Sequence, residues 1–123
     1  YTLRFGLEAM GHALDDMAFR DRIIEALAKE GVPSGAWQKF ILPDMSVFQA
    51  KNAFGKGYPW AATEAEVDYT PEQFPVAQRH CETHTCIVAA LRPPNSPDVA
   101  RLIAKGIRKV MENVNALECQ DSR

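Results

Sequence analysis

Two histidines and two cysteines occur close together in the stretch HCETHTC. If this stretch is helical, His80 and His84 lie four residues apart and share a face, as two zinc ligands would. Cys86 supplies a third ligand only if the helix ends just before it, and Cys81 is turned away by about 100°. The remaining histidine and cysteine are isolated in the sequence. The ordinary interpretation is a histidine at a helix end beside two buried thiols, so we predict no metal site.

Lys56 is the second candidate, because it lies between two glycines in the sequence FGKGY. The glycine-rich nucleotide-binding motif requires G-x-x-x-x-G-K-[ST] between a strand and a helix, and this spacing is absent. We therefore expect only a loop that offers the Lys56 ammonium to an anion. No G-x-S-x-G nucleophile motif occurs either. The sequence contains no complete active site, and we predict no catalytic residue within it.

The first elements that would position these groups are a strand and a helix. Apolar and polar residues alternate over residues 1–7, which predicts a half-buried strand. Asp15 or Asp16 can cap a helix that runs to about Glu30, where Gly31 and the following Val-Pro pair end it. Its predicted apolar stripe consists of Phe19, Ile23, Ala26 and Leu27. Its predicted water-facing residues are Arg20, Asp21, Arg22, Glu25 and Lys29.

The middle of the chain is rich in aromatic residues but lacks sustained periodicity over residues 34–73. A short helix over residues 46–53 is the one regular element that we expect there. A loop of this length is usually functional or faces a partner. A helix of about ten residues follows from Phe74, with Ala77, Cys81 and His84 as candidates for its apolar face.

The last third of the chain gives the clearest pattern. The apolar run over residues 86–91 predicts a strand, which the Arg-Pro-Pro-Asn turn ends. Ser96 is the predicted N-cap of a long helix that starts at Pro97, and Gly106 on its apolar stripe indicates close approach to another element. The stripe consists of Val99, Leu102, Ile103, Ile107, Val110, Met111, Val114 and Leu117. The order β-α-(irregular)-α-β-α predicts a two-layer α/β fold of the α+β type, with a small mixed or antiparallel sheet backed by helices.

Composition bounds the function. With 123 residues, 46% hydrophobic and 24% charged, the chain fits one globular domain over residues 1–123. No apolar run reaches the roughly 20 residues of a membrane helix, and no signal-peptide pattern is visible. Three cysteines are too few for a disulfide scaffold, so we expect a cytoplasmic setting. A net charge of -2 favours a solvated face for the basic residues of the last helix, and we expect no nucleic-acid partner.

Several short strings in this order resemble the C-terminal small domain of the DegT/StrS-type sugar aminotransferases, which are pyridoxal-phosphate enzymes of fold type I. They are the helix end EGVP, the Leu-Pro pair before an aromatic loop, the string FPVA and the final strand–turn–helix. Trp37-Gln38 and the stretch GKGYPW look most like members that act on cyclitols or aminoglycoside precursors. Many members carry a histidine shortly after the Leu-Pro pair, whereas this chain has Asp44 and Met45, so that substrate contact is not carried over.

The resemblance implies transfer of an amino group through the cofactor to a keto-sugar or ketocyclitol in amino-sugar biosynthesis. In such enzymes the Schiff-base lysine and the phosphate-binding residues belong to the large domain, which is absent from this sequence. We therefore expect no cofactor bound by this chain alone, and a missing large domain or a second subunit as its partner. The small domain would supply one wall of the substrate cleft and part of a dimer contact, in a homo-oligomer. The implied substrate-facing residues are Trp37, Gln38, Tyr58 and Trp60, with Lys56 for an anionic group.

A second hypothesis is a stand-alone binding or oligomerisation module that keeps the small-domain fold without the catalytic half. The chain enters a strand pattern at Tyr1 rather than at a methionine, which is the expectation for part of a longer protein. The two hypotheses differ in what precedes Tyr1: a large domain with a Schiff-base lysine, or the start of the gene.

Overall fold

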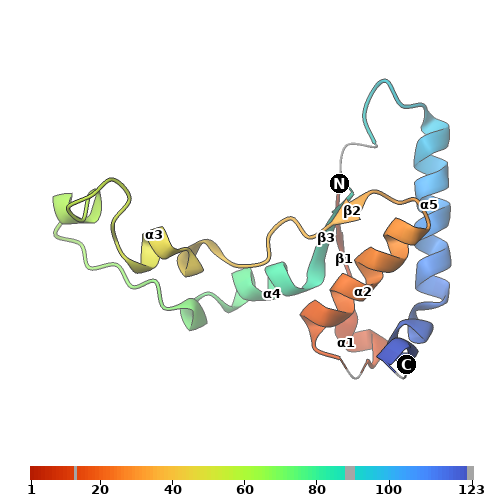
Figure 1. The fold of residues 1–123 in the computed structure, drawn as a ribbon, viewed down its shortest axis with the longest axis horizontal. Helices are drawn as coiled ribbons and strands as arrows, with labels where there is room; N and C mark the ends of the chain where they lie inside the picture. The colour runs from red at the N-terminus through yellow and green to blue at the C-terminus, as the bar shows by residue number, and fades with distance from the viewer. Residues whose placement is uncertain (13, 88–90, 122–123) are drawn as a thin grey trace. The chain divides into compact units, whose positions relative to one another are not determined.

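The computed structural model describes residues 1–12, 14–87 and 91–121 of the chain (Figure 1). By its internal contacts the chain divides into two compact units. We call the first, formed by Tyr1–Trp37 and Glu82–Arg123, the sheet unit, and the second, Gln38–Cys81, the aromatic unit. The sequence predicts one domain over the same length.

The sheet unit is built on three short antiparallel strands, β1 (Thr2–Arg4), β2 (Ser34–Gly35) and β3 (His84–Ile87). The strand order is β1-β3-β2, so β3 is central and both neighbours run antiparallel to it. Thr2 lies opposite Cys86 in the first pair. The prediction of a small helix-backed sheet is confirmed in this coarse form, and among the described residues its strands are antiparallel.

The strands are shorter than predicted. β1 ends at Arg4, and Leu7, the last residue that we assigned to that strand, begins a short helix, α1 (Leu7–Met10). Arg4 is the last residue of β1 with a strand partner, because it pairs with His84 and the residue before His84 already belongs to a helix. The strand predicted over residues 86–91 begins two residues earlier, and Leu91 is an exposed turn residue. Residues 88–90 of that prediction lie outside the described residues.

The sheet unit has two long helices, α2 (Asp16–Lys29) and α5 (Pro97–Glu112). α2 packs against β2 and β3, and α5 packs against α2. Both begin where the capping residues predict. Asp15 Oδ1 accepts a hydrogen bond from the Ala18 amide at 3.0 Å, and Ser96 Oγ accepts one from the Asp98 amide at 3.3 Å. Gly31, which follows the C-cap Glu30 of α2, has φ of +76°, a conformation that favours glycine. Within the described residues, no helix is both long and apolar enough to span a bilayer.

The core of the sheet unit lies where α2 contacts α5 and the strands β2 and β3. Its buried residues are Phe5, Phe19, Ile23, Leu27, Val32, Ile87, Ile103 and Val110. Ile23 and Leu27 are fully buried, as the stripe of the first helix predicts. Gly106 is also buried, and a Cβ built on it would lie 2.7 Å from Val32 Cγ2. The predicted close approach of another element at this glycine is confirmed.

The predicted faces of α2 and α5 are each wrong at one residue. Arg20, predicted to face water, has no exposed surface, and its Nη2 contacts Asp21 Oδ1 at 2.6 Å. Leu102, predicted on the buried stripe, is 68% exposed because it lies about 100° around the helix from the buried Ile103. α5 also ends earlier than its predicted apolar stripe, at Glu112. Val114–Asp121 form a 3-10 helix, and its residues Val114 and Leu117 still pack on the core.

Candidate functional site

The aromatic unit consists of short helical turns joined by extended segments. Its regular elements are 3-10 turns at Leu42–Asp44, Trp60–Ala62 and Pro71–Gln73, the single-turn helix α3 (Ser46–Gln49) and most of α4 (Pro75–Thr83). The helix predicted over residues 46–53 forms, but ends after one turn. The prolines at the starts of these turns explain the punctuated structure, because proline favours the first position of a helical turn and cannot donate a backbone hydrogen bond.

Three aromatic rings hold the ends of this segment together. Trp60 Nε1 donates a hydrogen bond to the Tyr69 hydroxyl at 2.9 Å, and the Phe48 ring packs edge-on against Trp60 with centroids 5.9 Å apart. Phe48 and Tyr69 are 5.3 Å apart. The Gln49 amide nitrogen donates to the carbonyls of Pro43 and Tyr69 at 2.7 and 2.9 Å. The rings of Phe48, Trp60 and Tyr69 therefore form an internal anchor, and half-buried Trp60 belongs to it.

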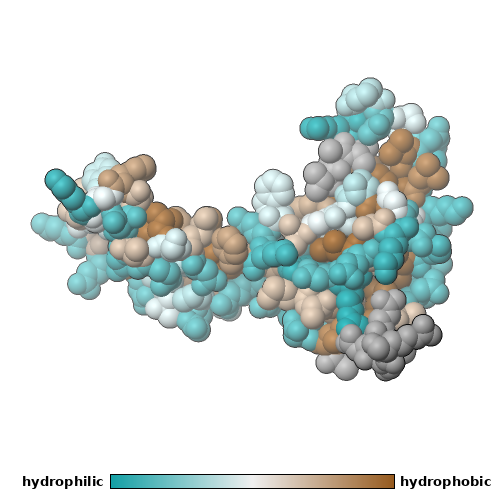
Figure 2. Space-filling view, viewed as in Figure 1, coloured by the Kyte–Doolittle hydropathy of each residue, from teal (hydrophilic) through white to brown (hydrophobic). Residues whose placement is uncertain are grey.

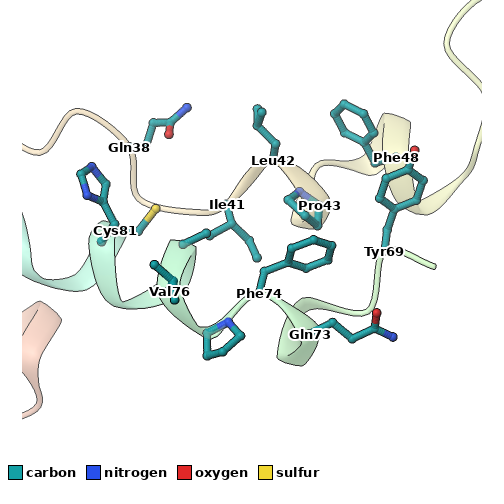
Figure 3. A pocket seen from close by; sticks show the side chains of 13 residues that line it. Gln38, Ile41, Leu42, Pro43, Phe48, Tyr69, Gln73, Phe74, Val76 and Cys81 are labelled. Carbon is teal, nitrogen blue, oxygen red and sulfur yellow. The ribbon is translucent and has the colours of Figure 1, made fainter. Parts of the chain in front are cut away.

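A groove of about 830 Å³ lies beside this anchor, within the aromatic unit. It runs between residues 38–48 and residues 69–81 (Figure 3). The figure shows the side chains of Ile41 and Phe74 directed toward one another across it, and Ile41 is buried. The lining residues are Gln38, Ile41, Leu42, Pro43, Phe48, Tyr69, Gln73, Phe74, Pro75, Val76, Ala77, His80 and Cys81. The lining is mainly apolar, with a few polar groups that can orient a bound group by hydrogen bonds.

Asp68 organises the extended segment that leads into the groove. Its Oδ1 accepts hydrogen bonds from the Thr70 hydroxyl at 2.6 Å and the Thr70 backbone amide at 2.8 Å. Its Oδ2 accepts one from Nε2 of the Gln73 side chain. These hydrogen bonds, first that from the Thr70 hydroxyl, hold the pKa of Asp68 below its usual value, with a smaller contribution from the charge of Lys51. The carboxylate thus stabilises the turn at Pro71–Gln73, one side of the groove.

Lys56 stands at the tip of a tight turn. The Tyr58 amide donates to the Gly55 carbonyl at 3.0 Å, and the two central residues, Lys56 and Gly57, have φ of +52° and +74°. Positive φ at both central positions is the pattern of a type I′ turn. The Gly57 amide donates to Asn52 Oδ1, which fixes the loop from the other side. The exposed Lys56 is therefore presented to solvent on a defined turn.

Large apolar side chains of the aromatic unit reach the surface, and they are visible in the space-filling view (Figure 2). Phe54 is 81% exposed and Tyr58 is 53% exposed, with their rings 6.1 Å apart. Others are Phe40, Leu42, Met45, Val67 and Val76. By contrast, Ile41 and Cys81 are the buried apolar residues of this unit. The unit therefore exposes more large apolar side chains than it covers.

The structure brings together part of the predicted substrate-facing set. Gln38 lines the groove, and Trp60 stands beside it in the anchor formed with Phe48 and Tyr69. Lys56 and Tyr58 lie together on the type I′ turn, but do not line the groove. Trp37 is 75% exposed and is assigned to the sheet unit.

Of the residues predicted to face a substrate, only Gln38 lines the groove, so the sequence did not predict its other lining residues. The signal that could have found it is the pair of Pro-containing strings, Leu42-Pro43 and FPVA, because both contribute lining residues. Taken alone, neither string carries a side chain that signals chemistry. A single sequence does not show that two such strings, about thirty residues apart, face one another.

The histidine-cysteine stretch does not form the helical pair considered above. α4 ends at Thr83, so His80 is helical whereas His84 is the first residue of β3. The helical spacing that would place both imidazoles on one face is therefore wrong. Cys81 is buried and lines the groove. Among the residues that the structure describes, no group of three or more histidine, cysteine, aspartate or glutamate side chains is placed to hold a metal ion.

No protein-family model matches the chain, and no curated protein matches its sequence. A function for this chain therefore has to be argued from its own residues. What they offer is an apolar groove with polar groups along it, and a lysine and a tyrosine presented on a nearby turn of the same unit. These groups can bind and orient a partner or a substrate.

Proposed function

We propose that this chain is the C-terminal small domain of a pyridoxal-phosphate-dependent aminotransferase of the DegT/StrS type. In this proposal it supplies one wall of the cleft for a keto-sugar or ketocyclitol, together with part of a dimer contact, in an enzyme of the cytoplasm. The large domain, whether in the same polypeptide or in a second subunit, provides the reactive lysine and binds the cofactor. The 123-residue chain by itself is not catalytically competent.

The observation that carries the proposal is that the aromatic unit exposes more large apolar side chains than it buries. Its interior covers Ile41 and Cys81, while Phe54 and Val76 are more than four-fifths exposed. Exposed apolar area on this scale is characteristic of a surface that another protein part covers. In the sequence, the residues of the aromatic unit are inserted between β2 and β3 of the small antiparallel sheet.

The residues described here do not fit the cofactor itself. All six lysines of the sequence are solvent-exposed, and a lysine that forms a Schiff base is usually activated by a desolvated pocket. Lys56 lies in the aromatic unit, is exposed and does not line the groove. We therefore assign no chemical step to this chain. The roles left to it are to bind, orient and exclude water.

Within that role the predicted residues divide by chemistry. Gln38 in the groove can hydrogen-bond a hydroxyl or carbonyl oxygen, and Lys56 can pair with an anionic substituent. Tyr58 beside Lys56 offers a ring face to a sugar and a hydroxyl to its oxygens. Trp60 acts through the anchor, because its indole nitrogen is already hydrogen-bonded to Tyr69. It is a positioning residue in this proposal.

The reading frame upstream of Tyr1 provides the first test. We expect it to encode a large domain with a Schiff-base lysine. The protein from the complete frame should show the visible absorbance of a lysine-bound pyridoxal phosphate, and the 123-residue chain mixed with the cofactor should not. Specific formation of that absorbance by the short chain, on one stoichiometric lysine, would contradict the proposal.

Point variants of the complete protein test the substrate role. Lys56→Ala and Tyr58→Ala should raise KM for the ketone substrate by about tenfold each, the effect of losing roughly 1.4 kcal/mol of binding. The cofactor absorbance should stay unchanged. Leu102→Ala is the matched control, because Leu102 is an exposed residue of α5 in the sheet unit. Equal KM values for all three variants and the parent protein would remove these residues from the cleft.

The stand-alone module remains a second proposal, favoured by the same exposed apolar groove. It predicts that an in-frame stop precedes the start of the chain and that the protein self-associates through the aromatic unit. Light scattering distinguishes it: a strict monomer at high concentration would count against the module, and leaves the aminotransferase proposal unaffected.

A further inference from the structure

We draw no further inference here: the strongest candidate, the apolar groove of the aromatic unit between residues 38–48 and 69–81, belongs to the site already described, and nothing in the structure shows what covers it.

Discussion

Replacing Gly106 by alanine tests the packing of α5 against the end of α2. The glycine is buried in the middle of α5, where alanine would ordinarily stabilise the helix by about 1 kcal/mol. Here the added Cβ would lie 2.7 Å from Val32 Cγ2, well inside van der Waals contact. Val32 is β-branched and 2% exposed, so its side chain has little freedom to move aside.

The two effects oppose one another, and their sizes decide the sign. Overpacking of a close-packed core costs roughly 1–3 kcal/mol, which exceeds the gain of about 1 kcal/mol in helix propensity. We therefore expect Gly106→Ala to lower the free energy of unfolding by about 1 kcal/mol. Val32→Ala alone removes two buried methyl groups and should cost about 2 kcal/mol. In the Val32→Ala background the collision is gone, so Gly106→Ala should become stabilising by about 1 kcal/mol.

Urea unfolding followed by circular dichroism measures all four proteins of this double-mutant cycle. The expected result is a coupling energy of about 2 kcal/mol between the two sites and equal m-values. Gly35→Ala serves as the control, since a Cβ at Gly35 meets no atom within 4 Å and should change stability by less than about 0.5 kcal/mol. The reasoning is refuted if Gly106→Ala stabilises the parent protein as much as it stabilises the Val32→Ala variant.

Three further predictions concern the core, the anchor and the acidic turn. Ile23→Ala should cost about 2–5 kcal/mol because Ile23 is fully buried, whereas Leu102→Ala should cost less than about 0.5 kcal/mol; similar losses in urea unfolding would show that α2 is misplaced. Trp60→Phe should lose about 1 kcal/mol with the hydrogen bond to Tyr69, while exposed Trp37→Phe should not; hydrogen exchange within the aromatic unit reads this out, and equal exchange in both variants argues against the anchor. Thr70→Val should raise the pKa of Asp68 toward its usual 3.8, as measured by carboxyl carbon NMR. Because the folded pKa of Asp68 is lowered, its contribution to stability is complete above about pH 3.8 and is lost as the pH falls through the lowered value; an Asp68 pKa unchanged by Thr70→Val would contradict the assignment.

The helices of the sheet unit could be predicted from the sequence because their signals are local. Asp15 and Ser96 cap the helices that they were expected to cap, and the three-and-four spacing identifies Ile23 and Leu27 as core. β2 could not be predicted in this way, since Ser34 and Gly35 carry no strand propensity and pair with β3 only through tertiary structure. The early end of β1 is likewise set by its partner strand, because β3 begins at His84, opposite Arg4, and the residue before His84 belongs to α4.

The misplacement of Arg20 has a different cause. By spacing, Arg20 lies on the same face as Ile23 and Leu27, three and seven residues later, so periodicity alone would have placed it inside. Charge suggested the opposite, because an unpaired buried charge is costly. The structure resolves the conflict by pairing: Nε and Nη2 of Arg20 both contact Asp21 Oδ1, at 3.0 and 2.6 Å. Helical spacing was therefore a better guide than residue type at this position.

The structure of the aromatic unit could not be predicted because many of its apolar side chains are exposed, and the same exposure makes it the candidate site. When one face of a helix or strand is buried, its apolar residues recur at a regular spacing in the sequence. Residues 38–73 show no such regular spacing. In the structure Phe54, Tyr58 and Val67 are exposed, while Phe48 and Trp60 are held by contacts between their rings. Such a segment gains little stability from burial in its own interior, and the contacts that hold it are those of the ring anchor formed by Phe48, Trp60 and Tyr69. The proposed function gives these exposed rings a role, because it makes them the surface that another part of the enzyme covers.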